Sequence, residues 1–245
     1  MIDPAEIAAL AALAFVGALI FGITGFGSAL VTIPLATHLV PLQFALALFA
    51  LSDLVGSYRV GLENPRNAVR GEWIRLVPMI LVGTALGVTL LVNLPRAAGM
   101  LLLGAFVLSY AVYSLFRHPS HRLVSSRWAW FAGLAGGITS TLFGAGGPPY
   151  AIYLSQRGLS KEQFRATLGF ATMTSISLRV LAFLLTGLLL DARVWIAAAA
   201  VVPAAFIGIG VARRVFRRIS RDTLLRAVTL MLLASGGSLI FRALT

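Results

Sequence analysis

Long stretches without a charged residue restrict the fold of this chain more than any other feature. Segments 76–92, 97–116 and 194–212 carry no charge, and each approaches the roughly 20 apolar helical residues that cross a bilayer. Hydrophobic residues make up 59% of the 245 residues and charged residues 11%, against about 45–50% and about 25% in soluble domains. The sequence therefore predicts an all-α, multi-pass integral membrane protein.

The composition also argues against several classes of function. The chain has no cysteine, which excludes disulfides and thiolate metal sites. Its formal net charge of +12 comes from arginines in short segments between apolar stretches, a pattern typical of topology signals rather than of a nucleic-acid surface. Asp3 and Glu6 near the start disfavour a removable signal peptide. We expect no metal, no cofactor and no nucleic-acid partner.

Eight apolar segments are recognisable, and two of them are interrupted. They cover residues 5–37, 41–60, 73–92, 97–116, 128–156, 161–187, 193–212 and 222–243. The first and fifth contain glycine and proline clusters, at residues 22–28 and 143–149, which break helices. If all eight segments cross the membrane, Lys and Arg divide almost equally between its two sides, so that topology has no charge bias.

Two re-entrant hairpins would change this balance. If the first and fifth segments turn at mid-membrane and return, sixteen Lys and Arg residues lie on one side and only Arg96, Arg193 and Arg242 on the other. Because cytoplasmic loops collect Lys and Arg, we predict six crossings, two hairpins and both termini outside the cytoplasm. Eight full crossings are the alternative, since hydropathy does not separate a hairpin from a broken spanning helix.

The two halves of the chain repeat the same features in the same order. Gly25-Phe-Gly27 matches Gly144-Ala-Gly146, Gln43-Phe44 matches Gln163-Phe164, Arg59-Val60 matches Arg179-Val180, and Pro78 and Gly83 match Pro203 and Gly208. Chance similarity between apolar segments is the alternative. With three crossings in each half the repeats would be inverted, an arrangement that places a site at the bilayer midplane. We predict a first repeat at 1–117, a basic cytoplasmic linker at 118–127 and a second repeat at 128–245.

The two glycine clusters are the predicted substrate site. The half-helix that returns from each cluster presents N–H groups at its positive end, which suits a small anion. The candidate residues are Thr24, Gly25, Phe26, Gly27 and Ser28 in the first cluster and Gly144, Ala145, Gly146, Gly147 and Tyr150 in the second. Close helix packing is the alternative role of small residues, and we expect it for Gly83 with Gly87 and for Gly133 with Gly137.

Three charged residues within apolar segments complete the candidate site. Asp53 lies where a charge costs about 2.5–3.5 kcal/mol; it either takes up a coupling proton or cation, or has a structural role as a helix cap or an ion-pair partner. Arg179 lines an anion path near the external mouth or reaches to the interface. Arg165, nearer the cytoplasmic end, has a coupling or gating role, with a topology charge as the alternative.

The glycine motifs have a counterpart in a known family. They comprise Gly25-Phe-Gly27-Ser28 with Pro34 and, more specifically, Phe143-Gly-Ala-Gly-Gly-Pro-Pro-Tyr150, Tyr153-Leu and Gln163-Phe-Arg-Ala-Thr167. With these motifs the chain resembles the sulfite exporter TauE/SafE family over nearly its full length, although Ser28 stands where the family form has a third glycine. The resemblance implies transport of small sulfur-containing anions such as sulfite or an organosulfonate like sulfoacetate, usually outward across a bacterial inner membrane.

The expected function is that of a secondary transporter, in which the anion is held near the midplane between the two glycine clusters. Its partners would be the small anion, the lipid bilayer and a coupling proton or cation. A passive channel and a transporter of another organic anion are the alternatives. An enzyme is disfavoured, because the intramembrane region offers one carboxylate and no histidine, which provide neither an acid–base pair nor a metal cluster.

Overall fold

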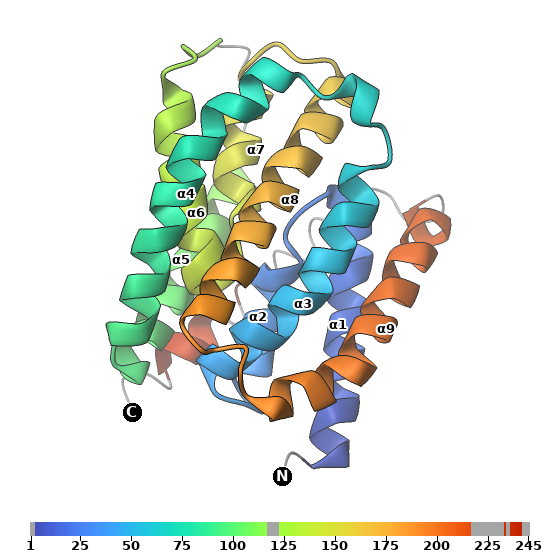
Figure 1. Cartoon of the computed structure of the whole chain (residues 1–245), viewed down its shortest axis with the longest axis vertical. Helices are drawn as coiled ribbons and strands as arrows, with labels where there is room; N and C mark the ends of the chain where they lie inside the picture. Colours follow the sequence, from blue (N-terminus) through green and yellow to red (C-terminus); the bar gives the residue numbers. More distant parts are fainter. Residues whose placement is uncertain (1–2, 117–122, 217–232, 234–235, 242–245) are drawn as a thin grey trace.

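The computed structural model of the chain is a bundle of helices (Figure 1). It describes residues 3–116, 123–216, 233 and 236–241, and contains no strand within these ranges. The helices are α1 (Pro4–Thr24), α2 (Ser28–Ala36), α3 (Leu42–Gly61), the short 3-10 helix η1 (Pro65–Asn67), α4 (Arg70–Asn93), α5 (Arg96–Phe116), α6 (Trp128–Phe143), α7 (Gly147–Ser155), α8 (Lys161–Leu185) and α9 (Ala192–Phe216). Part of the predicted linker, most of the eighth apolar segment and both chain ends lie outside the described residues.

Six of these helices, α1, α3, α4, α5, α8 and α9, are long and apolar enough to cross a membrane. The prediction of an all-helical, multi-pass membrane protein is thereby confirmed. Helix α6 has 16 residues and α2 and α7 have nine each, so that at about 1.5 Å per residue they fall short of the roughly 30 Å hydrocarbon core. Helix α1, with 21 residues, is longer than a half-helix, a difference from the expected hairpin geometry.

Both interrupted segments break at glycines with a left-handed backbone. Gly25 and Gly27 have φ of 81° and 90° between α1 and α2, and Gly144 has φ of 72° between α6 and α7. Residues with a Cβ adopt this conformation at a cost of roughly 1–2 kcal/mol. Glycine avoids this cost, which is why the helices end at these glycines. Pro148 and Pro149 follow in the first turn of α7, where a missing N–H removes no helical hydrogen bond.

The chain folds back on itself after each break (Figure 1). Helix α2 returns along α1, so that a Cβ added to Gly17 would touch the side chains of Thr32 and Ser28. Helix α7 returns along α6 in the same way, and the ring of Tyr150 lies directly against Gly136. Each interrupted segment is therefore a compact pair of helices with a glycine turn at its tip.

The helices also pair between the two halves of the chain. Helix α1 packs along α9, α6 packs along α4, and α3 packs against α8. Glycines allow this close approach: a Cβ on Gly208 would lie 2.5 Å from the carbonyl oxygen of Phe15, and one on Gly137 2.5 Å from that of Ile80. Equally close contacts between α4 and α6 involve Gly83, Gly87 and Gly133. The packing role expected for the two glycine pairs is confirmed.

Helices α3 and α8 lie at the centre of the bundle and carry many of its buried polar residues. Helix α3 is the most buried of the six candidate spans, although its mean hydropathy of 1.3 is the lowest. On these two helices the buried polar side chains are Ser52, Asp53 and Ser57 on α3 and Thr167, Thr172, Ser175 and Arg179 on α8; others lie on α2, α4 and α6. These polar groups face protein instead of lipid, which is where intramembrane polar residues are tolerated.

Candidate functional site

A buried ion pair joins α3 to α8 beside the two glycine turns. Nη2 of Arg179 donates a hydrogen bond to Oδ2 of Asp53 at 2.8 Å, and the two side chains are 1% and 8% exposed. Ser28, the first residue of α2, donates from Oγ to Oδ1 of Asp53 at 2.8 Å. Nη1 of Arg179 donates to the carbonyl oxygen of Ser140 on α6 at 3.1 Å. The pair therefore connects both interrupted segments through one carboxylate and one guanidinium.

The protein does not use the whole guanidinium of Arg179. Within the described part of the chain, its Nε is buried without a hydrogen-bond acceptor. Nε and Nη2 form one edge of the planar group, an edge that matches two oxygens of a single oxyanion. Asp53 fills only the Nη2 position, because its other oxygen is held by Ser28. A buried donor left unpaired costs about 1–3 kcal/mol, so this edge is suited to one more acceptor.

A small cavity lies beside Asp53 between the two glycine turns. Its lining includes eight of the predicted substrate-binding residues: Phe26, Gly27, Ser28, Gly144, Ala145, Gly146, Gly147 and Tyr150. The other lining residues are Phe21, Asp53, Ser140, Thr172, Ser175 and Ile176. The centres of water-sized molecules can occupy about 20 Å³ of it, little more than the roughly 10–15 Å³ that one water requires. In this conformation the cavity is too small for an anion of several heavy atoms.

Glycine is required where the two turns approach the ion pair. A Cβ on Gly144 would lie 3.0 Å from Nη1 of Arg179 and 2.7 Å from the Cβ of Ala29. A Cβ on Gly147 would collide with the side chain of Phe26 from the opposite turn. The absence of side chains at these two positions therefore lets the turns meet around the guanidinium.

Three predicted substrate-binding residues, Thr24, Gly25 and Arg179, are not among the residues that line this cavity, and Thr24 and Gly25 shape the first turn instead. The hydroxyl of Thr24 donates to the carbonyl oxygen of Ile20 at 2.8 Å and also to that of Phe26. The N–H of Gly25 donates to the carbonyl oxygen of Phe21 at 2.7 Å. These bonds satisfy the backbone where α1 ends.

The two candidate arginines on α8 lie in different surroundings. Arg179 is buried, and its side chain reaches inward to Asp53. Arg165 is exposed and does not line the cavity; its Nη2 lies 3.4 Å from Oε2 of Glu63 and 3.3 Å from the carbonyl oxygen of Gly22. It thus links α8 to the end of α1 and to the segment after α3.

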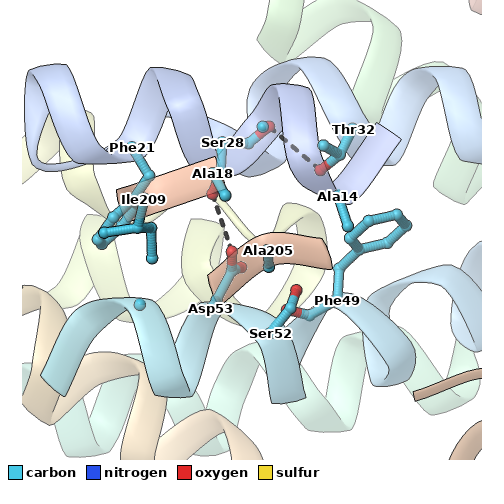
Figure 2. A pocket seen from close by; sticks show the side chains of 12 residues that line it. Ala14, Ala18, Phe21, Ser28, Thr32, Phe49, Ser52, Asp53, Ala205 and Ile209 are labelled. Carbon is cyan, nitrogen blue, oxygen red and sulfur yellow. Dashed lines mark hydrogen bonds between the residues drawn. The ribbon is translucent and has the colours of Figure 1, made fainter. Parts of the chain in front are cut away.

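A second small cavity touches Asp53 on the side of α1 and α9 (Figure 2). Apart from Asp53, its polar lining consists of the hydroxyl-bearing residues Ser28, Ser52 and Thr32. Thr32 donates to the carbonyl oxygen of Ser28 at 3.1 Å, and Ser52 to that of Phe49 at 3.0 Å. Its volume, about 10 Å³ for water-sized centres, is near the minimum for one water. Asp53 and Ser28 therefore stand between two cavities.

A separate buried carboxylate, Glu72, fastens the start of α4 to the end of α7. Arg157 donates from Nη2 to Oε1 of Glu72 at 2.8 Å and from Nε to Oε2 at 3.1 Å. Tyr153 donates to the same carboxylate, and Arg75 does so at 3.0 Å. The hydrogen bonds to Glu72 raise the pKa of Arg157, which also donates to the carbonyl oxygen of Val124. This cluster was not predicted from the sequence.

Phe21 and Ile176, which line the first cavity, were also not predicted from the sequence. Both are apolar residues within apolar segments, so no feature of the sequence distinguishes them from lipid-facing neighbours. The hydroxyls of Tyr150 and Ser175 lie on the same cavity and are joined at 3.0 Å. Among the described residues, no group of three or more His, Asp or Glu side chains is placed to hold a metal ion.

Comparison with known proteins gives one match that covers most of the chain. A family model described as "Sulfite exporter TauE/SafE" matches residues 10–239, a range that contains both glycine turns and the central ion pair. Neither a curated protein nor a solved structure matches the chain.

Proposed function

The chain belongs to the sulfite exporter TauE/SafE family, and from this premise we propose that it is a secondary transporter of small sulfur-containing anions, such as sulfite or an organosulfonate. The family is one of membrane transporters, and the six apolar helices fit a multi-pass membrane protein. We place the protein in a bacterial inner membrane, with export as the direction. The observation that carries the proposal is the buried guanidinium of Arg179, with one acceptor position open, between two glycine turns.

The surroundings of Arg179 favour an oxyanion. Sulfite and sulfonates present several oxygens on one sulfur, so two of them match the Nε and Nη2 edge of a guanidinium. Ser28 begins α2, whose first-turn N–H groups have no acceptor within the helix and lie at its positive end. Helix α7 contributes fewer N–H donors, because Pro148 and Pro149 in its first turn have no N–H. Under this proposal the residues of both glycine turns form the substrate site.

We propose that the halves are inverted repeats which exchange access to the site between the two sides of the membrane. The pairing of helices supports this arrangement: exchanging the two halves turns the α1–α9 contact into the α6–α4 contact and maps the α3–α8 contact onto itself. The proposed topology has six crossings and two re-entrant hairpins, with both termini outside the cytoplasm. The small cavity fits a closed intermediate, from which either side opens by movement of one half against the other.

Transport by the purified protein in liposomes tests this function. Uptake of sulfite, sulfoacetate, taurine and acetate is compared with and without an imposed pH gradient. We expect saturable uptake of sulfite or sulfoacetate, and weaker uptake of acetate and of zwitterionic taurine. Failure to transport any of the four would refute the transporter proposal, and a flux far above carrier turnover without saturation would identify a channel.

A pair of arginine variants separates the site from general charge effects. Arg179→Gln removes the buried guanidinium, and we expect it to abolish uptake. Arg193→Gln removes an exposed arginine that pairs with the nearby Asp191, and uptake should be unchanged. Equal activity of the two variants would show that the anion does not bind at Arg179.

A further inference from the structure

We propose that Asp53 occupies the place of the anion on Arg179, and that binding of the anion releases Asp53 to take up one proton, so that anion and proton move together. This inference rests on the proposed function, because it concerns the same guanidinium. It adds the coupling ion, the residue that carries it and the number of protons for each anion.

The anion and Asp53 compete for one edge of the Arg179 guanidinium. Oδ2 of Asp53 is bound to Nη2 of Arg179, while Nε on the same edge has no acceptor. An oxyanion that binds this edge places one oxygen on Nη2, the nitrogen that already holds Oδ2 of Asp53. Because two anionic oxygens on one nitrogen repel each other, the anion displaces the carboxylate. The remaining nitrogen, Nη1, stays on the carbonyl oxygen of Ser140 and keeps the guanidinium in position.

Displacement leaves the negative charge of Asp53 without its partner. With the anion on Arg179, an ionised Asp53 would be a buried negative charge without its counter-ion, and such a group neutralises by binding a proton. Helices α1, α2 and α9 bring no titratable side chain to the two cavities that touch Asp53. On the α7 side the titratable group is Tyr150, whose hydroxyl is bonded to Ser175. Arg179 is therefore the cation that balances either Asp53 or the anion.

Protonation of Asp53 also requires a route for the proton. The cavity drawn in Figure 2 reaches Asp53 from the side of α1 and α9. It has room for about one water, and hydroxyls of Ser28, Ser52 and Thr32 belong to residues that line it. A hydroxyl both donates and accepts hydrogen bonds, so Ser28, now a donor to Asp53, can accept from the protonated acid. The proton comes from water and returns to water when Asp53 pairs with Arg179 again.

This coupling gives an ordered pair of states. Asp53 ionised and bound to Arg179 is the form without anion, and Asp53 protonated with the anion on Arg179 is the loaded form. One proton offsets one negative charge of the anion during transfer. Net export then requires an outward anion gradient larger than the opposing proton gradient, which suits an anion that accumulates inside the cell.

Proton uptake on anion binding tests the inference directly. The detergent-solubilised protein is mixed with sulfoacetate in weak buffer between about pH 6 and pH 8. The sulfonate and the carboxylate of sulfoacetate both stay ionised in this range, because a carboxyl group titrates at about 4. Sulfite is avoided because it titrates within this range. We expect about one proton taken up for each anion bound, and therefore an affinity that falls about tenfold for each unit by which the pH is raised.

Two acid variants provide the matched comparison. In Asp53→Asn we expect sulfoacetate to bind without proton uptake and with an affinity independent of pH, since the neutral amide mimics the protonated acid. Asp191→Asn, a change at an exposed acid far along the chain, should behave as the wild type. If Asp53→Asn does not fold, the proton count of the wild type still decides.

Three results would separate the possibilities. Binding without proton uptake by the wild type overturns the coupling and leaves the transporter proposal intact. A pH-independent requirement for sodium also overturns it, since the cation would then be a metal ion. Absence of binding and transport for every anion of the liposome panel instead refutes the proposed function.

Discussion

Removing only one charge of the Asp53–Arg179 pair should destabilise the protein. The two single destabilisations should sum to more than the destabilisation caused by removing both charges together. Asp53→Asn leaves a guanidinium that is 1% exposed, and Arg179→Gln leaves a carboxylate that is 8% exposed. Breaking a buried pair on one side costs about 3–5 kcal/mol, whereas replacing both charges is often close to neutral. The single changes therefore sum to about 6–10 kcal/mol, and the double variant should fall below that sum by about 3 kcal/mol or more.

Reversible unfolding in mixed detergent micelles, followed by tryptophan fluorescence, measures these differences. The wild type, both single variants and the double variant complete a thermodynamic cycle. Asp191 and Arg193 form an exposed pair two residues apart, and the same cycle at this pair should give a coupling within experimental error. If Asp53→Asn and Arg179→Gln are additive within about 0.5 kcal/mol, the pair does not exist in the folded protein.

Three further predictions concern the glycine turns, the α4–α7 contact and the topology. Gly144→Ala and Gly25→Ala share the strain of a left-handed backbone, but of the two glycines only Gly144 has close neighbours. Overpacking should make the Gly144→Ala protein about 1–3 kcal/mol less stable than the Gly25→Ala protein and inactive in transport. Equal stabilities of the two variants would contradict this. Glu72→Gln should lower the unfolding free energy by about 1–3 kcal/mol, because it leaves donors of Arg157 without a charged acceptor. Arg157 is partly exposed and water screens the pair, which limits the loss; an unchanged unfolding curve would show the contact to be unimportant. Single cysteines at His38 and Gln156, in a chain that has none, should react with impermeant reagents from outside and from the cytoplasm respectively, and the reverse pattern would refute the proposed hairpins.

The features that the sequence predicted well depend on local chemistry. The helix breaks at Gly25 and Gly144 follow from glycine and proline within otherwise apolar runs, and the short helix α7 begins where Pro148 permits it. The packing of Gly83 and Gly137 was predictable because small residues allow membrane helices to approach closely. In each case the residue type determines the backbone or contact distance within a few positions.

The features that the sequence left open depend on contacts between distant residues. Asp53 and Arg179 lie 126 positions apart, so neither segment alone shows whether the carboxylate pairs with an arginine, caps a helix or is reserved for an ion. Glu72 stands at the edge of an apolar segment among arginines, and only the return of α7 surrounds it with partners. The length of α1 was also open, because nothing in its apolar run stops the helix before Gly25.

The separation of Asp53 from its partner also affects how the protein enters the membrane. A ribosome adding about 5–20 residues each second completes the 126 positions between Asp53 and Arg179 in roughly 6–25 s. During that time α3, the least apolar of the six candidate spans, carries a carboxylate whose insertion costs about 2.5–3.5 kcal/mol, before its counter-ion exists. Insertion of the first half is therefore more favourable if Asp53 is protonated until α8 arrives. Under the proposed function, the acid that carries the coupling proton thus also affects how readily the chain inserts.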